Sequence, residues 1–257
     1  MLYVLESVKP AVVKQRLVDM PQSLDEAYQK LIDRIVDKET AFQILSWISH
    51  ARRPLKVDEL LEAIAIEIGT PEMDETNLIK PQDIGHACCG IVILEGSNDT
   101  VRFVHDTVKD FLPRANIPNE DKKMILTRTE ISLACLTYLN FDVFDTIHFD
   151  KQFVLQRMRI RKFGKYASQF WALHTKCEAE KSANVQAATL RLLQSENKKT
   201  SMLQMEAYAH SRLDSIEFTK NKTALHILAE KGLAIICSLF LFEHQDADKE
   251  CFLFNTD

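Results

Sequence analysis

Two histidines and an aspartate could together bind a metal ion and support hydrolysis. His86 is followed later in the chain by the adjacent pair His105 and Asp106, and neutral imidazoles with a carboxylate are suitable ligands for a divalent cation. A metal-dependent phosphohydrolase of this kind carries its ligands on helices, whereas His105 ends an alternating run that predicts a strand. We therefore interpret His105 as a hairpin residue and Asp106 as a helix cap. A metal-dependent phosphohydrolase using His86, His105 and Asp106 remains the alternative function.

The cysteines give no clear metal site or disulfide framework. His174 and Cys177 are three residues apart on an expected helix and could share a face, but a zinc site needs a further pair of ligands. The sequence has no C-x-x-C pair, and most cysteines stand among apolar residues, which is typical of reduced, buried thiols. The six cysteines are Cys88, Cys89, Cys135, Cys177, Cys237 and Cys251.

The sequence also lacks the motif that grips the phosphates of ATP. A loop of the type G-x-x-x-x-G-K-[ST] needs glycines for close backbone approach and a lysine for the terminal phosphates. The pair Gly164-Lys165 is followed by Tyr166 and has no glycine at the required spacing before it. No Ser/His/Asp or Cys/His set stands out as a local motif. We therefore predict no catalytic residue, no bound metal and no cofactor.

Composition and charge favour a cytoplasmic protein. Hydrophobic residues make up 46% and charged residues 27% of the 257 residues, which is the balance of a globular protein. The net charge of −5 gives no basic field for nucleic acid. No apolar run approaches the roughly 20 residues that cross a bilayer, and residues 1–6 do not resemble a signal peptide. We expect a cytoplasmic chain that binds neither nucleic acid nor membrane.

Residues 21–113 show the element order of a winged-helix domain. Ser23 and Glu26 have the spacing of a capping box, which begins a helix. The turn residues Gly96-Ser97-Asn98-Asp99 separate two β-type runs, which predicts a hairpin. Helices followed by a hairpin are the order of a winged helix. The expected elements are two helices before Pro54, an extended Arg53–Leu55, helices over 57–68 and ending near 88–90, strands over 91–95 and 100–105, and a last helix through Phe111.

A winged helix raises the question of DNA, because the recognition helix of such a unit enters the major groove. We take the helix over 57–68 as that helix. It contains no lysine or arginine, and acids repel a polyanion that cations must neutralise. We therefore predict that this helix faces protein. Its acids are Asp58, Glu59, Glu62 and Glu67, and the neighbouring Arg52, Arg53 and Lys56 are expected to form surface ion pairs that contribute little.

Residues 114–220 are predicted to form a bundle of linking helices. One apolar stripe starts after Thr127, a broad aromatic one spans 163–174, and a weaker helix covers 183–193, followed by a polar loop over 195–200. The aromatic stripe could be mistaken for a ligand box, but at helical spacing we interpret it as core. The stripes consist of Ile131, Cys135, Tyr138 and Leu139, and of Phe163, Tyr166, Ala167, Phe170, Trp171 and His174.

The last segment, residues 221–257, predicts two short antiparallel helices joined at Gly232, a glycine that can adopt positive φ. The run Thr223-Ala224-Leu225-His226 with Ala229 and Gly232 resembles the T-P-L-H-x-A-A…G signature of ankyrin repeats. Ala224 replaces the usual proline, and Leu228 replaces the first alanine. His244 and Gln245 stand where a glycine and an alanine are usual after the second helix, so the repeat is degenerate. The signature residues Thr223, Ala224, Leu225, His226, Ala229 and Gly232 are expected to be structural.

The upstream segments resemble, in order, the region that follows the nucleotide-binding domain in fungal NACHT–ankyrin proteins. The matching stretches are Met20–Tyr28, Ala51–Leu60 and Val101–Leu112, with a looser one at Tyr166, Ala167, Trp171 and His174. Lys56 stands where a capping Ser or Thr is usual, so a weaker helix start is expected. Residues 1–20 resemble the end of an upstream helical region. The resemblance implies a winged helix that packs on the nucleotide domain and holds it in an off state, with repeats that bind another protein.

Together these features predict a mainly helical chain: a remnant helical region (1–20), a winged-helix domain with a small β-hairpin (21–113), a helical linker bundle (114–220) and one truncated ankyrin-type helix pair (221–257). We expect a non-catalytic regulatory module that binds a protein partner, as a fragment or truncated form of a NACHT–ankyrin signalling NTPase. A truncated relic without a retained partner is a further alternative. Because each repeat needs neighbours to bury it, the apolar face near Phe240, Phe242 and Phe252 is expected to be sticky or disordered.

Overall fold

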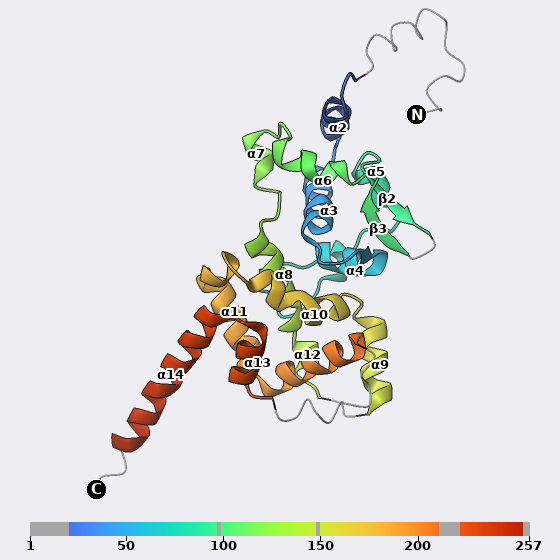
Figure 1. Ribbon diagram of the computed structural model, residues 1–257. Helices are drawn as coiled ribbons and strands as arrows, with labels where there is room; N and C mark the ends of the chain where they lie inside the picture. The colour runs from blue at the N-terminus through green and yellow to red at the C-terminus, as the bar shows by residue number, and fades with distance from the viewer. Residues whose placement is uncertain (1–20, 97–98, 148–149, 211–221, 254–257) are drawn as a thin grey trace, which may run out of the picture.

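The computed structural model describes residues 21–96, 99–147, 150–210 and 222–253, with only the backbone for residues 151 and 244–253. The described chain is mainly helical with one small sheet, as predicted (Figure 1). The winged-helix part, drawn in blue and green, lies beside a bundle of helices drawn in yellow and orange, and the last helix extends away from that bundle. The segment 1–20, predicted as an upstream remnant, lies outside the described residues.

The winged-helix elements follow the predicted order, with a third strand added. They are α2 (Leu24–Ile32), α3 (Lys38–His50), β1 (Leu55–Lys56), α4 (Val57–Ile64), α5 (Asp83–Ala87), β2 (Val92–Glu95), β3 (Thr100–Phe103) and α6 (Thr107–Phe111). The capping box at α2 is present in a shifted form. Ser23 Oγ accepts from Glu26 N at 3.1 Å, and the Glu26 carboxylate accepts from Gln22 N at 2.9 Å. α4 ends at Ile64, four residues before the predicted end.

The sheet is antiparallel, with strand order β1-β3-β2. The predicted hairpin pairs Leu94 with Val101 and Val92 with Phe103. β1 was predicted only as an extended stretch, but it adds to the other edge of β3, where Leu55 pairs with Val101. The buried Leu55, Val101 and Phe103 point into the core that α3 and α4 cover. The hairpin therefore packs on the helices, as a winged helix requires.

The helical linker surrounds a single central helix, α8. Thr127 caps it, since its Oγ1 accepts from Glu130 N at 3.3 Å while the Glu130 carboxylate accepts from Thr127 N at 2.7 Å. From Ile131 to Leu139 every residue of α8 is buried, because α10 and α11 pack on it and α3 of the winged helix contacts it. The linker helices are α7 (Asn119–Lys122), α8 (Arg128–Leu139), α9 (Lys151–Ile160), α10 (Gly164–Thr175), α11 (Ala183–Gln194) and α12 (Glu196–Ala209), with 3-10 turns at Asp142–Phe144 and Ala179–Lys181. Two further 3-10 turns, Glu75–Asn77 and Leu112–Arg114, precede the linker.

The polar stretch over 195–200 is helical, so the predicted loop is wrong. Ser195 caps α12, and two of the buried polar side chains that follow, Lys198 and Ser201, have partners in a distant part of the chain. Lys198 Nζ lies 2.7 Å from Asn140 O and 3.1 Å from Asp142. Ser201 Oγ donates to Phe144 O at 2.9 Å. A buried helix can be polar when distant groups satisfy its hydrogen bonds, and composition alone does not reveal this.

The C-terminal helix pair consists of α13 (Ala224–Lys231) and α14 (Ala234–Leu253). α14 is not the predicted short helix, because it continues through His244 and Gln245, where a repeat of this type would turn. Its exposed apolar side chains include Ile235, Leu239, Leu241 and Phe242, the last 67% exposed. Phe240 is half-buried against the core. The side chain of Phe252 lies outside the described residues. Among the described helices, none is long and apolar enough to span a bilayer.

Candidate functional site

The winged helix and the linker bundle meet at α4, which carries two buried acids. Glu59 is 2% exposed and receives both guanidinium nitrogens of Arg53 at 2.7 Å. Its carboxylate also accepts from Lys56 N at 2.9 Å. The side chain that caps the start of α4 therefore comes from Glu59 inside the helix and not from Lys56 at the N-cap position. A bidentate, largely desolvated pair of this kind fixes geometry as well as charge. It holds the start of α4 against the turn before β1.

Glu62 connects α4 directly to the linker. This carboxylate is 6% exposed and accepts from Tyr138 Oη at 2.5 Å, from Phe163 N at 2.9 Å and from Lys162 N at 3.0 Å. Phe163 N and Lys162 N stand at the start of α10, where free backbone donors favour a negative charge. Burial, followed by the nearby Glu62 charge, raises the pKa of Tyr138 well above its usual range. The tyrosine therefore stays a donor to Glu62.

These contacts correct two predictions about the acidic helix. Arg53 and Glu59 form a partly buried bidentate pair, not a weak surface pair, with side chains 27% and 3% exposed, and Glu59 and Glu62 face the interior of the chain. Asp58 keeps a surface contact, with Lys162 Nζ at 3.6 Å. The helix over 57–68, which we predicted to be the recognition helix, is α4. In the structure α5 stands between α4 and the hairpin, so α5 is the helix directly before the hairpin. α5 also contains no lysine or arginine.

A second polar group crosses the same boundary. Tyr166 Oη accepts from Arg52 N at 3.0 Å and lies 2.8 Å from His174 Nε2, which leaves the hydroxyl proton to be donated to the imidazole. Burial lowers the pKa of His174 to about 3, with smaller contributions from the Arg52, His50 and Arg128 charges. His174 is thus a neutral acceptor in the core. Together with the α4 acids, this group forms what we call the α4 joint: Arg52, Arg53, Glu59, Glu62, Tyr138, Phe163, Tyr166 and His174.

The residues that could have formed metal sites are not gathered into one. His86 is exposed on α5, and His105 Nδ1 lies 2.9 Å from Thr107 Oγ1 and accepts from Thr107 N at 3.3 Å. His105 therefore caps α6, and the prediction that the Asp106 side chain supplies the cap is wrong. In the part of the chain that the structure describes, no three His, Cys, Asp or Glu side chains are placed to hold a metal ion.

The second pair, His174 and Cys177, does not share a helical face. α10 ends at Thr175, and Cys177 is exposed with a φ of 65°, outside the helix on which it was predicted. The aromatic stripe of α10 is core as predicted, because Phe163, Tyr166 and Trp171 are all fully buried. Phe170 is half-buried, with the Arg53 guanidinium 5.8 Å from its ring centre.

The six signature residues shape α13. Thr223 Oγ1 accepts from His226 N at 3.3 Å and lies 2.7 Å from His226 Nδ1. Gly232 has a φ of 68° and ends the helix in the left-handed conformation. Ala224 is buried, Leu225 is half-buried, and His226 and Ala229 are exposed. Their membership of an ankyrin repeat stays a prediction, as does the division of the chain at residues 20, 113 and 220.

Sequence reasoning missed the residue that fixes the C-terminal pair to the linker. Glu180, which is 6% exposed in the 3-10 turn after α10, accepts from Ile235 N at 2.8 Å and Ile236 N at 3.2 Å. It therefore caps α14 from another part of the chain. No local signal could have identified it, because the two partners are 55 and 56 residues away.

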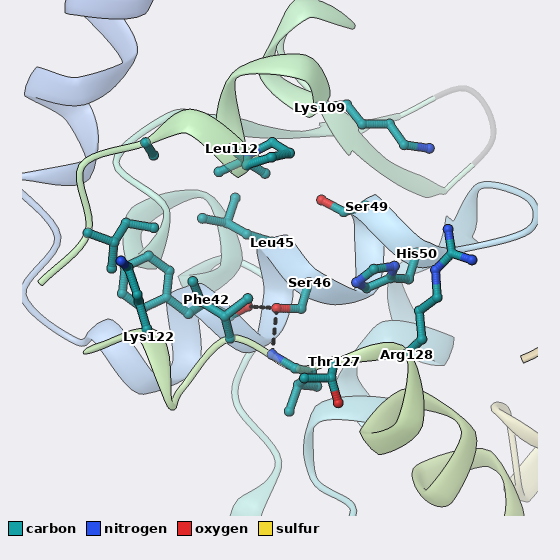
Figure 2. Close-up of a pocket in the computed structure, with 15 residues that line it drawn as sticks. Phe42, Leu45, Ser46, Ser49, His50, Lys109, Leu112, Lys122, Thr127 and Arg128 are labelled. Atoms are coloured by element: carbon teal, nitrogen blue, oxygen red, sulfur yellow. Dashed lines mark hydrogen bonds between the residues drawn. The ribbon is translucent and has the colours of Figure 1, made fainter. Parts of the chain in front are cut away.

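An open groove of about 600 Å³ lies between α3, the end of α6 and the segment before α8 (Figure 2). Ser46 Oγ donates to Phe42 O at 2.5 Å and accepts from Leu126 N at 3.0 Å, so the segment before α8 is tied to α3 along the groove. We call it the α3 groove. Its lining consists of Phe42, Leu45, Ser46, Ser49, His50, Lys109, Leu112, Pro113, Ala115, Ile117, Lys122, Ile125, Leu126, Thr127 and Arg128.

Residues 28–123 match the family model of the GPI inositol-deacylase winged helix domain. This part of the chain is therefore similar to that domain, and its fold is a winged helix. The prediction of a winged helix is thereby confirmed, and the match includes α3, α4 and the sheet. It also extends past residue 113 into α7.

Two curated fungal proteins are similar to the chain. Azaphilone pigments biosynthesis cluster protein L of Monascus ruber is 24% identical over 195 residues, which cover 69% of this chain and 40% of that protein. Vegetative incompatibility protein HET-E-1 of Podospora anserina is 32% identical over 108 residues, 41% of this chain and 8% of that protein. The chain thus spans less than half of each relative. No solved structure matches it. The fungal relatives agree with the resemblance to fungal NACHT proteins that the motifs indicated.

Proposed function

We propose that this chain is a non-catalytic regulatory module that binds a protein partner, and that it acts as the part of a NACHT–ankyrin signalling NTPase that follows the nucleotide-binding domain. The observation that carries the proposal is the α4 joint. Glu62 accepts from one donor on α8 and two at the start of α10, so a displacement of the winged helix must move the linker with it. A packed, hydrogen-bonded connection of this kind can carry a displacement from a domain that senses a partner to its neighbour.

The same joint argues against reading of DNA by α4. Two of the three acids of α4, Glu59 and Glu62, are inside the chain, and their partners cover that face of the helix. The helix directly before the hairpin, α5, carries Asp83 and His86 and no lysine or arginine. Affinity for DNA depends on cations that neutralise phosphates. Protein is therefore the partner class that we propose.

Purified chain provides the test. We expect no ATP hydrolysis above background, no ATP binding at micromolar concentrations, and no binding of duplex DNA at physiological salt. The variants Lys165→Ala and His105→Ala serve as controls, because an activity that both retain does not depend on either candidate residue. ATP hydrolysis that copurifies with the chain and is lost in one of these variants would refute the non-catalytic role.

A further inference from the structure

The α3 groove is lined by basic side chains, although the chain as a whole is acidic. Whereas the whole chain has a net charge of −5, the described lining of the groove includes no aspartate or glutamate. Within the described residues, none of its lysines and arginines has an ion-pair partner. The basic side chains are His50, Lys109, Lys122 and Arg128.

The basic groups stand at the two ends of the groove. Lys109 and Arg128 lie near His50 at one end, and Lys122 lies at the other (Figure 2). The pKa of His50 is consistent with this placement: burial lowers it first, followed by the charge of Arg128 and, more weakly, that of Lys109. No carboxylate of α3, α6 or the start of α8 is among the groups that shift the pKa of His50. The groove thus presents a split positive field.

Between these ends the floor is apolar. Phe42 and Leu45 of α3 form one side, and the half-buried Leu112 and Ile125 form the other. The volume of about 600 Å³ is in the range of sites that bury several side chains of a ligand. A compact anion would need its cations close together. An elongated ligand with an apolar middle and acids toward its ends fits the lining better.

We propose that the α3 groove binds the apolar face of an acidic amphipathic helix from another protein. Leucine-type anchors at i, i+3 or i+4 and i+7 would enter the floor, and glutamates near the two ends of the helix would face Lys122 on one side and Lys109 with Arg128 on the other. The charge complementarity selects acidic over basic helices and speeds their association. This inference rests on the proposed protein-binding role and names the kind of partner.

A peptide selection on the immobilised full chain tests the inference. The probe is a library of helical peptides of about four turns with a fixed leucine face and outward positions randomised among Glu, Ser and Lys. We expect recovered peptides to carry glutamate near both ends. In solution, fluorescence anisotropy should show that Lys109→Glu with Arg128→Glu weakens the best peptide about tenfold or more. The control Arg159→Glu, an exposed cation on α9, should leave the affinity unchanged.

Repeating the peptide selection on the double variant Lys109→Glu with Arg128→Glu gives a second readout that does not depend on any one peptide. The double variant should recover peptides with lysine at the end that faces residues 109 and 128. Recovery without acid enrichment, equal binding by the double variant and by wild type, or no recovery at all would overturn the inference. Self-association that the double variant abolishes would also overturn it, because a second copy would then occupy the groove. A partner protein that binds the double variant normally would refute the groove but leave the proposed function intact.

Discussion

Removal of the Glu62 carboxylate is the perturbation that most directly strains the α4 joint. In Glu62→Ala the hydroxyl of Tyr138 and the N–H of Phe163 lose their acceptor while both residues stay buried. A buried group left without a partner costs about 1–3 kcal/mol. Lys162 is exposed, so water can replace the third bond. Two orphaned groups give about 2–6 kcal/mol, and we expect about 3–5 kcal/mol, the usual cost of breaking a buried charged network.

Urea denaturation followed by circular dichroism measures this free energy of unfolding. The matched control is Asp58→Ala on the same helix, which removes an exposed acid and should cost less than about 1 kcal/mol. A double-mutant cycle with Tyr138→Phe separates the carboxylate–hydroxyl bond from the backbone bonds. We expect a coupling of about 1–3 kcal/mol, because the orphaned hydroxyl is absent from the double mutant. A Glu62→Ala cost no larger than that of the control, or zero coupling, would refute the reasoning.

Three further predictions follow from individual side chains. Burial lowers the pKa of His174 to about 3, so below pH 6.5 the unfolded chain binds more protons than the folded chain. The stability that the neutral imidazole contributes is therefore full above pH 6.5 and falls as the pH decreases. Acidification from pH 7 to pH 5 should lower the free energy of unfolding by about 2 kcal/mol through this residue. His174→Gln should flatten the pH profile of unfolding, whereas the surface variant His86→Gln should not. Equal pH profiles for the two variants would contradict the assignment. Burial raises the pKa of Cys88 to about 12. At pH 8 a maleimide should therefore label the exposed Cys177 first and Cys88 only in denaturant, as measured by mass spectrometry of the peptides. Early labelling of Cys88 would count against its burial. Gly232→Ala should destabilise α13 by about 1 kcal/mol because a side chain at a φ of 68° is strained, and hydrogen exchange in α13 unchanged from wild type would argue against this.

The fold was predictable where the signal is local. The capping box at Ser23 and Glu26 and the turn residues between β2 and β3 involve partners within a few residues. The helical spacing of apolar residues in α3 and α10 likewise gave elements close to those observed. These features identify a winged helix followed by a bundle. They do not show how the two parts meet.

The joint was not predictable because its partners are far apart in sequence. Glu62 receives a hydroxyl that is 76 residues away and an N–H that is 101 residues away. A glutamate on a helix is normally solvated, so the acids of α4 were expected on a surface. α12 failed as a prediction for the same reason, since Lys198 is satisfied by Asn140 O, 58 residues away. Local composition shows a polar residue but not the group that pairs with it.

Differential scanning calorimetry of the full chain tests most directly whether the winged helix and the linker form one unit. The α4 joint predicts one transition for both parts, with calorimetric and van't Hoff enthalpies that agree. In Glu62→Ala the same trace should shift to lower temperature or split. Two separate transitions in the unmodified chain would show that the parts unfold independently, and the connection through Glu62 would then not couple them.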